Sequence, residues 1–365
     1  MFELIDNQVS KEKHRVFDRP RSPGAGRVFV MGRNKYAKSV AQVAEVEAFV
    51  DDFTNEKTYL GRPIIRMSSL PSACLVVSCV VDGRPITALD RLRASNVIAV
   101  VDYFTLLRLA PDLFEPMDYC ANNRADISAN LSEYHRVCDC LADEESKETF
   151  KKVVQFRYTF DLDFMRGFSL RIDRQYFEDF LPLKVGEVFV DGGGFDGQTT
   201  LQFAARNPEY RRIHYFEPTP AMMEISRRNL KGLRDVRLVQ KGLFNREGGI
   251  KFDAGSGSAN KISDAGTTEI QLTTLDKEVS EPVSLIKLDI EGAEFEAING
   301  AVNHIQTHAP RLAVCVYHNQ PDFWRIPKRI LELNDRYKIY LRHYSEGVLE
   351  TVMFFIPPEV KSSIG

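Results

Sequence analysis

The chain has 365 residues, of which 44% are hydrophobic, 27% charged and 10% aromatic, which excludes fibrous, low-complexity and disordered classes. Lys and Arg number 48 against 51 Asp and Glu, so the net charge is −3. This balance leaves no single-signed field for nucleic acid or an anionic membrane, and we expect neither partner. The length predicts two domains.

The cysteine spacing and the apolar runs indicate the cellular compartment. None of the six cysteines forms a CxxC pair, and residues 1–26 carry charges throughout without the apolar stretch of a signal peptide. No apolar run approaches the roughly 20 residues needed to cross a bilayer. We therefore expect reduced thiols and a cytoplasmic protein.

The first half of the chain is predicted to hold a tail, a small domain and a connector. Residues 1–26 are polar and contain several Pro and Gly near their end, which predicts a tail. RVFVMG, VEAFVDD, ACLVVSCVV and NVIAVVDY then alternate with polar helical stretches, which predicts a smaller Rossmann-like α/β domain over residues 27–110. Residues 111–180 are assigned to a helical connector, because apolar residues return there at spacings of three and four.

The last part of the chain, residues 181–365, is predicted to form a second α/β domain. Seven segments read as strands: EVFVDGGG, RIHYFEP, VRLVQKG, SLIKLDIEG, RLAVCVYH, YKIYLRHY and TVMFFIP. Helices are expected over residues 196–206, 219–230, 294–307 and 322–333. The Gly- and Ser-rich stretch between residues 244 and 274 predicts a loop flanked by two strands, either a surface hairpin or a lid.

A glycine-rich turn follows the first strand of this domain. VFVDGGGFDGQT places Gly192, Gly193, Gly194 and Gly197 between a buried strand and a helix, where backbone N–H groups face a ligand. The spacing also matches the dinucleotide fingerprint GxGxxG, so a nicotinamide or flavin enzyme is an alternative. Asp191 stands directly before the turn, where it opposes a pyrophosphate and suits a ligand with an ammonium group, such as S-adenosylmethionine.

Further carboxylates follow two other predicted strands. Glu217 lies 25 residues after Gly192, where it can accept hydrogen bonds from the ribose hydroxyls of either cofactor. In IKLDIEGAE, Lys287, Asp289 and Glu291 alternate onto one side of the fourth strand. Ligands of open α/β sheets bind beyond the carboxyl ends of the strands, so we expect Asp289 beside the glycine turn.

Six segments occur in an order that resembles one known family: DGGGFDGQTT, FEP, LDIEGAE, LAVCVYHNQPDFWRIP, YLRHYS and ETVMFFIP. Over about residues 131–357 the chain resembles the FkbM family of S-adenosylmethionine-dependent methyltransferases. The resemblance implies a class I methyltransferase fold, with a seven-stranded Rossmann-like sheet whose last hairpin is reversed, and methyl transfer to oxygen. Many members have alanine and asparagine where this chain has Gly194 and Phe195. By position, the resemblance assigns cofactor binding to Asp191, Gly193, Gly197, Glu217 and Asp289.

An alcohol acceptor calls for a general base, and the candidates stand at the carboxyl ends of predicted strands. These candidates are Asp289, His318 and His343. We hypothesise that Asp289 and His318 border the methyl group, with Arg342 and Trp324 farther out toward the acceptor. Asp289 is a possible magnesium ligand, but we find no second and third carboxylate at convincing positions and predict no metal site.

The leading hypothesis is an O-methyltransferase that uses S-adenosyl-L-methionine and acts on a hydroxyl of a glycan, nucleotide sugar or secondary metabolite. The alternatives are an NAD(P)-dependent oxidoreductase and a non-catalytic scaffold that binds a cofactor. In the first domain, Asn34 and Ala37 stand where the dinucleotide fingerprint has glycine after Gly32. That domain is interpreted as structural or dimerising, which predicts a homo-oligomer, or as a site for a nucleotide-linked acceptor.

Overall fold

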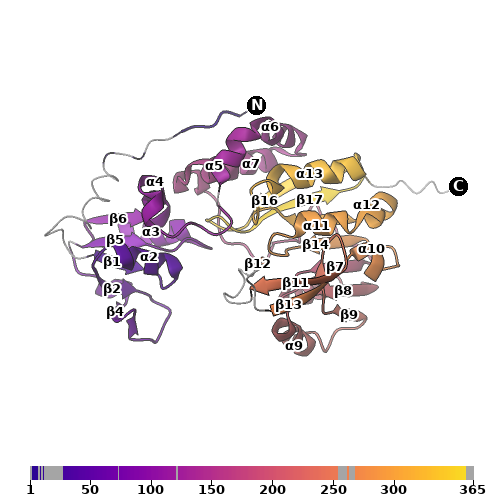
Figure 1. Ribbon diagram of the computed structural model, residues 1–365, viewed down its shortest axis with the longest axis horizontal. Helices are drawn as coiled ribbons and strands as arrows, with labels where there is room; N and C mark the ends of the chain where they lie inside the picture. Colours follow the sequence, from indigo (N-terminus) through magenta and orange to yellow (C-terminus); the bar gives the residue numbers. More distant parts are fainter. Residues whose placement is uncertain are drawn as a thin grey trace. The chain divides into compact units, whose positions relative to one another are not determined.

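The chain divides into two compact units, which Figure 1 shows in the computed structural model. Unit 1 comprises Met1–Ala129, Phe150–Ile172 and Tyr344–Leu349, and unit 2 comprises Asn130–Thr149, Asp173–His343 and Glu350–Gly365. The residues expected in a connector are thus shared between the two units. The structure describes residues 2–6, 9, 11, 28–72, 74–120, 122–253, 261–262 and 268–358. Within these ranges no helix combines the length and apolar character needed to cross a membrane.

Unit 1 contains a six-stranded sheet in the order β3-β4-β2-β1-β5-β6. Its neighbouring strands are parallel except for the β3–β4 pair. The four strands predicted in this domain are β1, β2, β5 and β6. The strands are β1 (Val28–Met31), β2 (Val46–Val50), β3 (Thr58–Tyr59), β4 (Arg62–Ile65), β5 (Leu75–Ser78) and β6 (Ala99–Asp102). The helices are α2 (Lys35–Val43), α3 (Pro85–Arg93), α4 (Tyr103–Leu109) and α5 (Asn123–Ala129), with short 3-10 turns at Met67–Ser69, Pro111–Leu113 and Leu162–Met165.

Unit 2 is built on a seven-stranded sheet in the order β16-β17-β15-β14-β7-β8-β9. Strand β17 is antiparallel to both neighbours and the other pairs are parallel, so the reversed last hairpin is β16–β17. All seven predicted strands are present. They are β7 (Val188–Gly192), β8 (Arg212–Phe216), β9 (Val236–Val239), β14 (Leu285–Leu288), β15 (Arg311–Cys315), β16 (Lys338–His343) and β17 (Thr351–Ile356).

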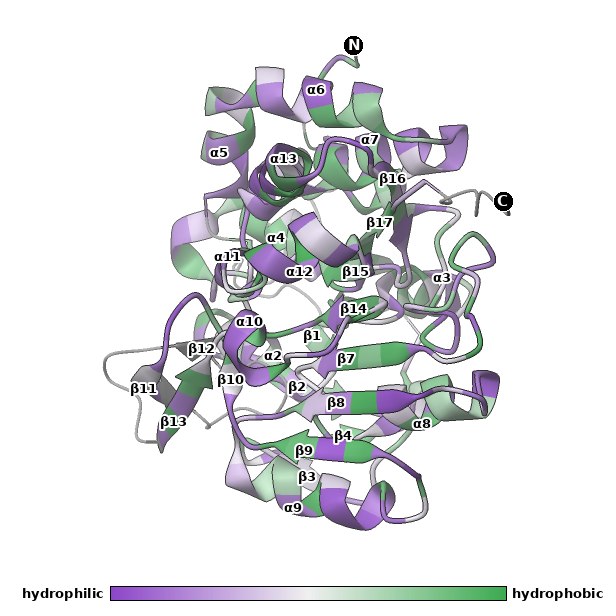
Figure 2. Cartoon of the chain, turned by 90° about the vertical axis from the view of Figure 1, so that its right-hand side faces the viewer, coloured by the Kyte–Doolittle hydropathy of each residue, from purple (hydrophilic) through white to green (hydrophobic). Residues whose placement is uncertain are grey.

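The core of unit 2 lies along the central strands of this sheet. Strands β7, β14 and β15 are buried along their whole length, and Figure 2 shows hydrophobic residues concentrated in the strands. Near-continuous apolar runs are typical of parallel strands that are covered on both faces. Phe189 of β7 stacks on Phe203 of α8 with 4.3 Å between ring centroids, which packs this helix onto the first strand.

One helix prediction in unit 2 is wrong. The helix expected over residues 294–307 is divided into α11 (Glu294–Asn299) and α12 (Val302–His308). A Cβ atom at Gly300 would lie 1.9 Å from the carbonyl oxygen of Phe244, so the chain bends where two backbones touch. The remaining helices are α6 (Leu131–Cys140), α7 (Glu144–Thr159, shared by the two units), α8 (Gln198–Arg206), α9 (Pro220–Asn229), α10 (Leu275–Glu278) and α13 (Asp322–Leu333).

A small second sheet of unit 2 has the order β10-β13-β11-β12. Its strands are β10 (Gly242–Leu243), β11 (Gly248–Asp253), β12 (Lys261–Ile262) and β13 (Thr268–Thr273). The two strands expected around the Gly- and Ser-rich loop are β11 and β13, which pair in antiparallel fashion. The middle of that loop, residues 254–260 and 263–267, lies outside the described residues, so the choice between hairpin and lid stays a prediction.

Candidate functional site

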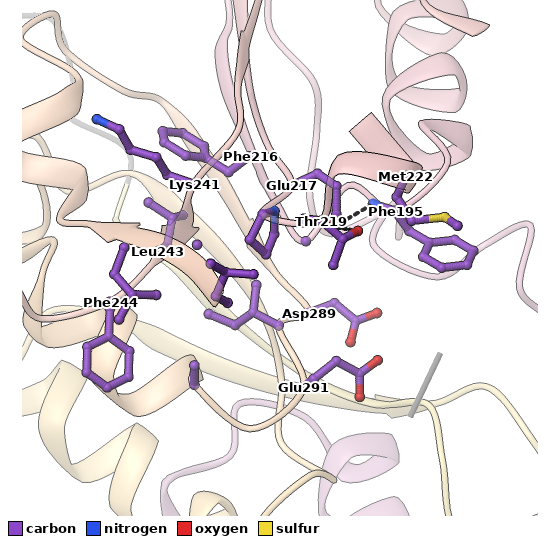
Figure 3. A pocket seen from close by; sticks show the side chains of 17 residues that line it. Phe195, Phe216, Glu217, Thr219, Met222, Lys241, Leu243, Phe244, Asp289 and Glu291 are labelled. Atoms are coloured by element: carbon purple, nitrogen blue, oxygen red, sulfur yellow. Dashed lines mark hydrogen bonds between the residues drawn. The ribbon is translucent and has the colours of Figure 1, made fainter. Parts of the chain in front are cut away.

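A cavity opens at the carboxyl ends of β7, β8 and β14 in unit 2 (Figure 3). Its walls come from the glycine turn, the segments after β8 and β14, and strands β10 and β13. The lining residues used below are Gly193, Phe195, Glu217, Met222, Asp289 and Glu291. The cavity therefore lies at the edge where ligands of open α/β sheets bind.

The glycine turn and the end of β14 touch through their backbones. Gly193 has a φ of +72°, and a Cβ atom there would lie 1.9 Å from the carbonyl oxygen of Asp289. The backbone N–H of Asp289 donates to the carbonyl oxygen of Gly192 at 3.2 Å. Only a glycine permits this approach, and it places Asp289 beside the turn as predicted.

Gly194 is required by a neighbouring aromatic ring. A Cβ atom at this position would lie 1.9 Å from Cε2 of Tyr215. The hydroxyl of Tyr215 donates to the carbonyl oxygen of Phe195 at 2.7 Å, which holds the ring under the turn. The tyrosine thus occupies the space that the alanine of many family members would need. Gly197, with a φ of +89°, precedes α8, and a Cβ atom there would lie 3.0 Å from Leu230.

Asp191 is fully buried and is paired inside the protein. It accepts a hydrogen bond from the Thr200 hydroxyl at 2.6 Å and lies 3.0 Å from the Lys287 ammonium group. Lys287 in turn donates to the carbonyl oxygen of Gly193 at 2.7 Å. Burial alone would lower the pKa of Lys287, but the Asp191 carboxylate keeps it raised. Asp191 therefore holds the turn through Lys287, and its direct contact with a cofactor stays a prediction.

Glu217 lies in the wall of the cavity with only 6% of its surface exposed. One carboxylate oxygen accepts from the Thr219 backbone N–H at 2.8 Å and from the Thr219 hydroxyl at 2.6 Å. The other accepts from the backbone N–H of Phe195 at 3.2 Å, the dashed line in Figure 3. Burial raises the pKa of Glu217, and these hydrogen bonds and the charge of Lys287 offset that rise only in part.

Asp289 and Glu291 lie in the turn after β14, not in the strand. The strand ends at Leu288, so the predicted alternation of Lys287, Asp289 and Glu291 along one strand is wrong. Glu291 has a φ of +58°, and this left-handed turn redirects its side chain. Figure 3 shows the carboxyl groups of Asp289 and Glu291 pointing the same way, and both residues line the cavity.

The Asp289 carboxylate is held by two buried phenols. Tyr176 donates to Oδ2 at 2.7 Å, and the Tyr317 hydroxyl lies 3.4 Å from Oδ1. Burial by itself would raise the pKa of Asp289, but the positive charges of Lys287 and His318 hold it below its usual value. Asp289 is thus ionised, with a side chain that is 25% exposed.

His318 is surrounded by three carboxylates and its side chain is 1% exposed. Nδ1 lies 2.9 Å from Glu294 Oε1, and Nε2 lies 3.5 Å from Glu291 Oε2 and 3.6 Å from Asp289 Oδ1. Burial alone would lower the pKa of His318, but these carboxylates raise it to about 9. In this state His318 is an imidazolium at neutral pH and cannot accept another proton, which argues against its predicted role as general base.

Of the residues predicted around the methyl group and the acceptor, Asp289 lines the cavity, whereas His318, His343, Arg342 and Trp324 are absent from the lining in the described part of the chain. His343 on β16 pairs its Nδ1 with the hydroxyl of Thr351 on β17 at 2.9 Å. The Arg342 guanidinium forms an ion pair with Asp143 at 2.8 Å, so the structure uses its charge away from the cavity. Trp324 lies in the first turn of α13.

The sequence analysis missed Tyr176, Tyr317 and Glu294. Tyr176 stands before the predicted sheet, Tyr317 lies in its fifth predicted strand, and Glu294 is the first residue of a predicted helix. Asp289, Glu294 and His318 each offer an atom of a metal-ligating type, and these atoms all lie within 4.8 Å of one another. The prediction of no metal site therefore overlooked this cluster.

Comparison with known proteins agrees with this geometry. Residues 191–344 match the family model described as the methyltransferase FkbM domain. This region belongs to the FkbM methyltransferase family. The FkbM region contains the glycine turn, Glu217, Asp289 and His318. No curated protein matches the chain.

A solved structure confirms the fold that the FkbM resemblance implies. The chain is similar to the crystal structure of methyltransferase FkbM from Methylobacillus flagellatus KT, with a TM-score of 0.75 and 22% identity over 95% of this chain and 94% of that one. An rRNA methylase from Streptococcus thermophilus has a TM-score of 0.33 and 17% identity over 48% of this chain and 90% of its own. Aeropyrum pernix fibrillarin, solved with natively bound S-adenosyl-L-methionine, has a TM-score of 0.33 and 12% identity over 48% of this chain and 69% of its own. The fold of unit 2 is that of a class I methyltransferase, as predicted.

Proposed function

We propose that unit 2 is an S-adenosyl-L-methionine-dependent methyltransferase that methylates a hydroxyl oxygen of a small-molecule or glycan acceptor. The family supports methyl transfer. The observation that carries the choice of cofactor is the pair of carboxylates, Asp289 and Glu291, that lines the cavity and favours a positively charged ligand. Glu217 adds a buried carboxylate in the cavity wall whose hydrogen-bond partners are all neutral. Such a carboxylate suits the two hydroxyls of a ribose.

The other lining residues fit an adenosyl group with a positively charged sulfur. Apolar side chains that suit a flat purine ring line the cavity beside Glu217, and they are Met222, Leu243, Phe244, Ile270 and Leu272. Asp289 and Glu291 place negative charge at the same cavity, which favours a cation. When bound, S-adenosyl-L-methionine supplies an electrophilic methyl group on a sulfonium centre.

The chain's own residues mainly have to align the acceptor and exclude water. Asp289 is ionised and accepts a hydrogen bond from the acceptor hydroxyl in this proposal. Tyr176 and Tyr317 hold that carboxylate in place. Burial raises the pKa of both phenols well above the usual value, so they remain donors at neutral pH. His318 acts as a positive charge behind Asp289, not as the base.

The oxidoreductase alternative still has the GxGxxG spacing in its favour. The argument against a pyrophosphate now rests on different residues, because Asp191 is neutralised by Lys287. Asp289 and Glu291 face the cavity instead, and two carboxylates beside the turn repel a pyrophosphate.

Calorimetric titration of the full chain with S-adenosylhomocysteine, and with NADPH in parallel, tests the proposal. We expect one micromolar site for S-adenosylhomocysteine and no heat from NADPH. Binding of NADPH alone would replace the proposal with the oxidoreductase, and binding of neither would leave the scaffold. A positive result leads to acceptor screening with labelled S-adenosylmethionine, where methyl incorporation into hydroxylated compounds and its loss after O-demethylation identify the bond formed.

A further inference from the structure

The cluster of Asp289, Glu294 and His318 has a feature that methyl-donor binding does not explain. These three residues come from the turn after β14, the start of α11 and the segment after β15, and their ligand-type atoms lie within 4.8 Å of one another. Two of them, Glu294 and His318, are almost fully buried. Asp289 also lines the cavity, so the cluster borders the site where the acceptor is proposed to bind.

Glu294 contributes an unsatisfied oxygen to this cluster. Its side chain is 0% exposed, and Oε1 accepts from the backbone N–H of Ile290 at 2.8 Å and faces His318 Nδ1 at 2.9 Å. The second oxygen, Oε2, is buried and has no hydrogen-bond partner among the residues that the structure describes. A buried carboxylate oxygen without a donor is costly, so it calls for a cation or a proton.

The cluster also has more acidic than basic side chains, which favours binding of a cation. Glu291, Glu294 and Asp289 surround one imidazole, with the closest atoms 3.5, 2.9 and 3.6 Å from its nitrogens. Three carboxyl groups from three positions thus face a single imidazole. An imidazole with several carboxylates is the donor set of first-row divalent metals more than of Ca²⁺, which prefers oxygen ligands alone.

We propose that Asp289, Glu294 and His318 bind one first-row divalent cation, such as Mn²⁺ or Zn²⁺, with Glu291 at the rim of the site. Binding replaces the imidazole proton, which leaves to solvent, because a ligating nitrogen needs its lone pair. The cation then supplies the positive charge beside Asp289 that His318 supplies in the metal-free protein. A cation beside the cavity would take the acceptor oxygen as a ligand and lower the pKa of its hydroxyl. This role rests on the proposed function, whereas the binding site itself does not.

Mn²⁺ binding to the chelator-treated full chain tests the site, with loss of the free Mn²⁺ EPR signal as the readout. We expect one Mn²⁺ per chain in the micromolar range, and at least a 10-fold weaker affinity in E294Q and H318Q. E296Q is the matched control, because Glu296 lies on the same helix and pairs with Asn245. Wild-type protein that binds no Mn²⁺, or equal affinities in E294Q, H318Q and E296Q, would overturn the proposal.

A second measurement requires no variant and covers the case in which E294Q or H318Q fails to fold. Pulsed EPR of Mn²⁺ bound to the wild-type chain reports a nitrogen coupling when an imidazole ligates the ion. We expect this coupling, and bound Mn²⁺ without it contradicts the site. Titration with S-adenosylhomocysteine is independent of both readouts: cofactor binding without Mn²⁺ binding removes only the metal inference, and Mn²⁺ binding without cofactor binding removes only the proposed function.

Discussion

The two units begin their parallel sheets with the same arrangement of strand, turn and helix. The two turns differ in the side chains that contact them. In unit 1, β1 leads through Gly32 into α2, and Asp51 follows the next strand. In unit 2, β7 leads through the glycine turn into α8, and Glu217 follows the next strand. Both turns therefore place a carboxylate at the carboxyl edge of a sheet.

The turn in unit 1 is satisfied by its own side chains. Asn34 donates to the carbonyl oxygen of Cys79 at 2.8 Å and accepts from the backbone N–H of Ala37 at 2.9 Å. Arg33 Nε lies 2.7 Å from the Asp51 carboxylate, which is thereby neutralised. A cavity lies at this edge too, lined in part by Gly32, Asp51 and Phe53, but its carboxylate is already engaged.

The turn in unit 2 is also held by side chains, since Lys287 donates to the carbonyl oxygens of Gly192 and Gly193 and Asp196 accepts from the backbone N–H of Gln198. What differs is the carboxylate after the next strand, which lines a cavity without a cation as its hydrogen-bond donor. Glycines approach Asp289 and Tyr215 closely, and Glu217 has only neutral donors around it. The comparison teaches that the carboxylate beside the turn is suited to a ligand when its hydrogen-bond donors are neutral, as for Glu217, and not when an arginine pairs with it, as for Asp51. Four predictions test this difference between the turns.

The largest expected effect is that of G193A compared with G32A. A Cβ atom at Gly193 overlaps the Asp289 carbonyl oxygen at 1.9 Å, whereas at Gly32 the nearest atom is 3.5 Å away and only the φ of +108° is strained. We expect the free energy of unfolding, measured in urea, to fall by about 4 kcal/mol or more in G193A and by about 1–2 kcal/mol in G32A. Equal losses of unfolding free energy in G193A and G32A would contradict the predicted difference in backbone contact between the two turns.

The second-largest expected effect is the loss of unfolding free energy when Lys287, the buried lysine beside the glycine turn of unit 2, is replaced. K287M leaves the fully buried Asp191 without its cation, which costs about 3–5 kcal/mol in unfolding free energy. R33M breaks a pair whose side chains are 23% and 17% exposed, and we expect about 1 kcal/mol or less. The double variant D191N/K287M is expected to recover part of the loss, and a double variant no more stable than K287M contradicts the pairing.

The affinity for S-adenosylhomocysteine is expected to distinguish Glu217 in unit 2 from Asp51 in unit 1. E217Q keeps the size of the side chain but removes the charged acceptor, so S-adenosylhomocysteine binding is expected to weaken about 10–100-fold in calorimetry. D51N is the control in the other turn and should bind S-adenosylhomocysteine like wild type. Unchanged affinity in E217Q would remove Glu217 from the proposed ribose site.

The smallest effect is a pH dependence of opposite sign at the two carboxylates. Burial raises the pKa of Glu217 above 4.5, so wild type loses stability relative to E217Q as the pH rises from 4.5 through the raised value. Burial alone would also raise the pKa of Asp51, but Arg33 holds it below 3.8. Wild type is thus more stable than D51N above pH 3.8, and the difference disappears as the pH falls through the lowered value. Urea unfolding at several pH values should give differences of about 1 kcal/mol or less with opposite signs, and equal signs contradict the comparison.

The strands and the turn were predictable because their signals are local. Short apolar runs separated by turn residues predicted all seven strands of the larger sheet, and the spacing from Gly192 to Glu217 placed both at its carboxyl edge. The divided helix was not predictable, because Gly300 meets the backbone of Phe244, which is 56 positions earlier in the chain.

Side-chain pairing at the site depends on contacts between distant segments. Asp191 looked like a ligand group from its position, yet Lys287, 96 positions later, neutralises it. His318 looked like a base, yet Asp289, Glu291 and Glu294 surround it. The periodicity of a strand gives the face of a residue but not the neighbours that folding brings to it.

The sequence by itself determined the α/β class, the seven-stranded sheet and the carboxylates at its edge, since each depends on residues close together in the chain. The tertiary structure alone decided which of these charges face the cavity and which are neutralised inside the protein. The physical reason is that charge state depends on burial and on the nearest charges, and both are set by segments that meet only in the folded chain.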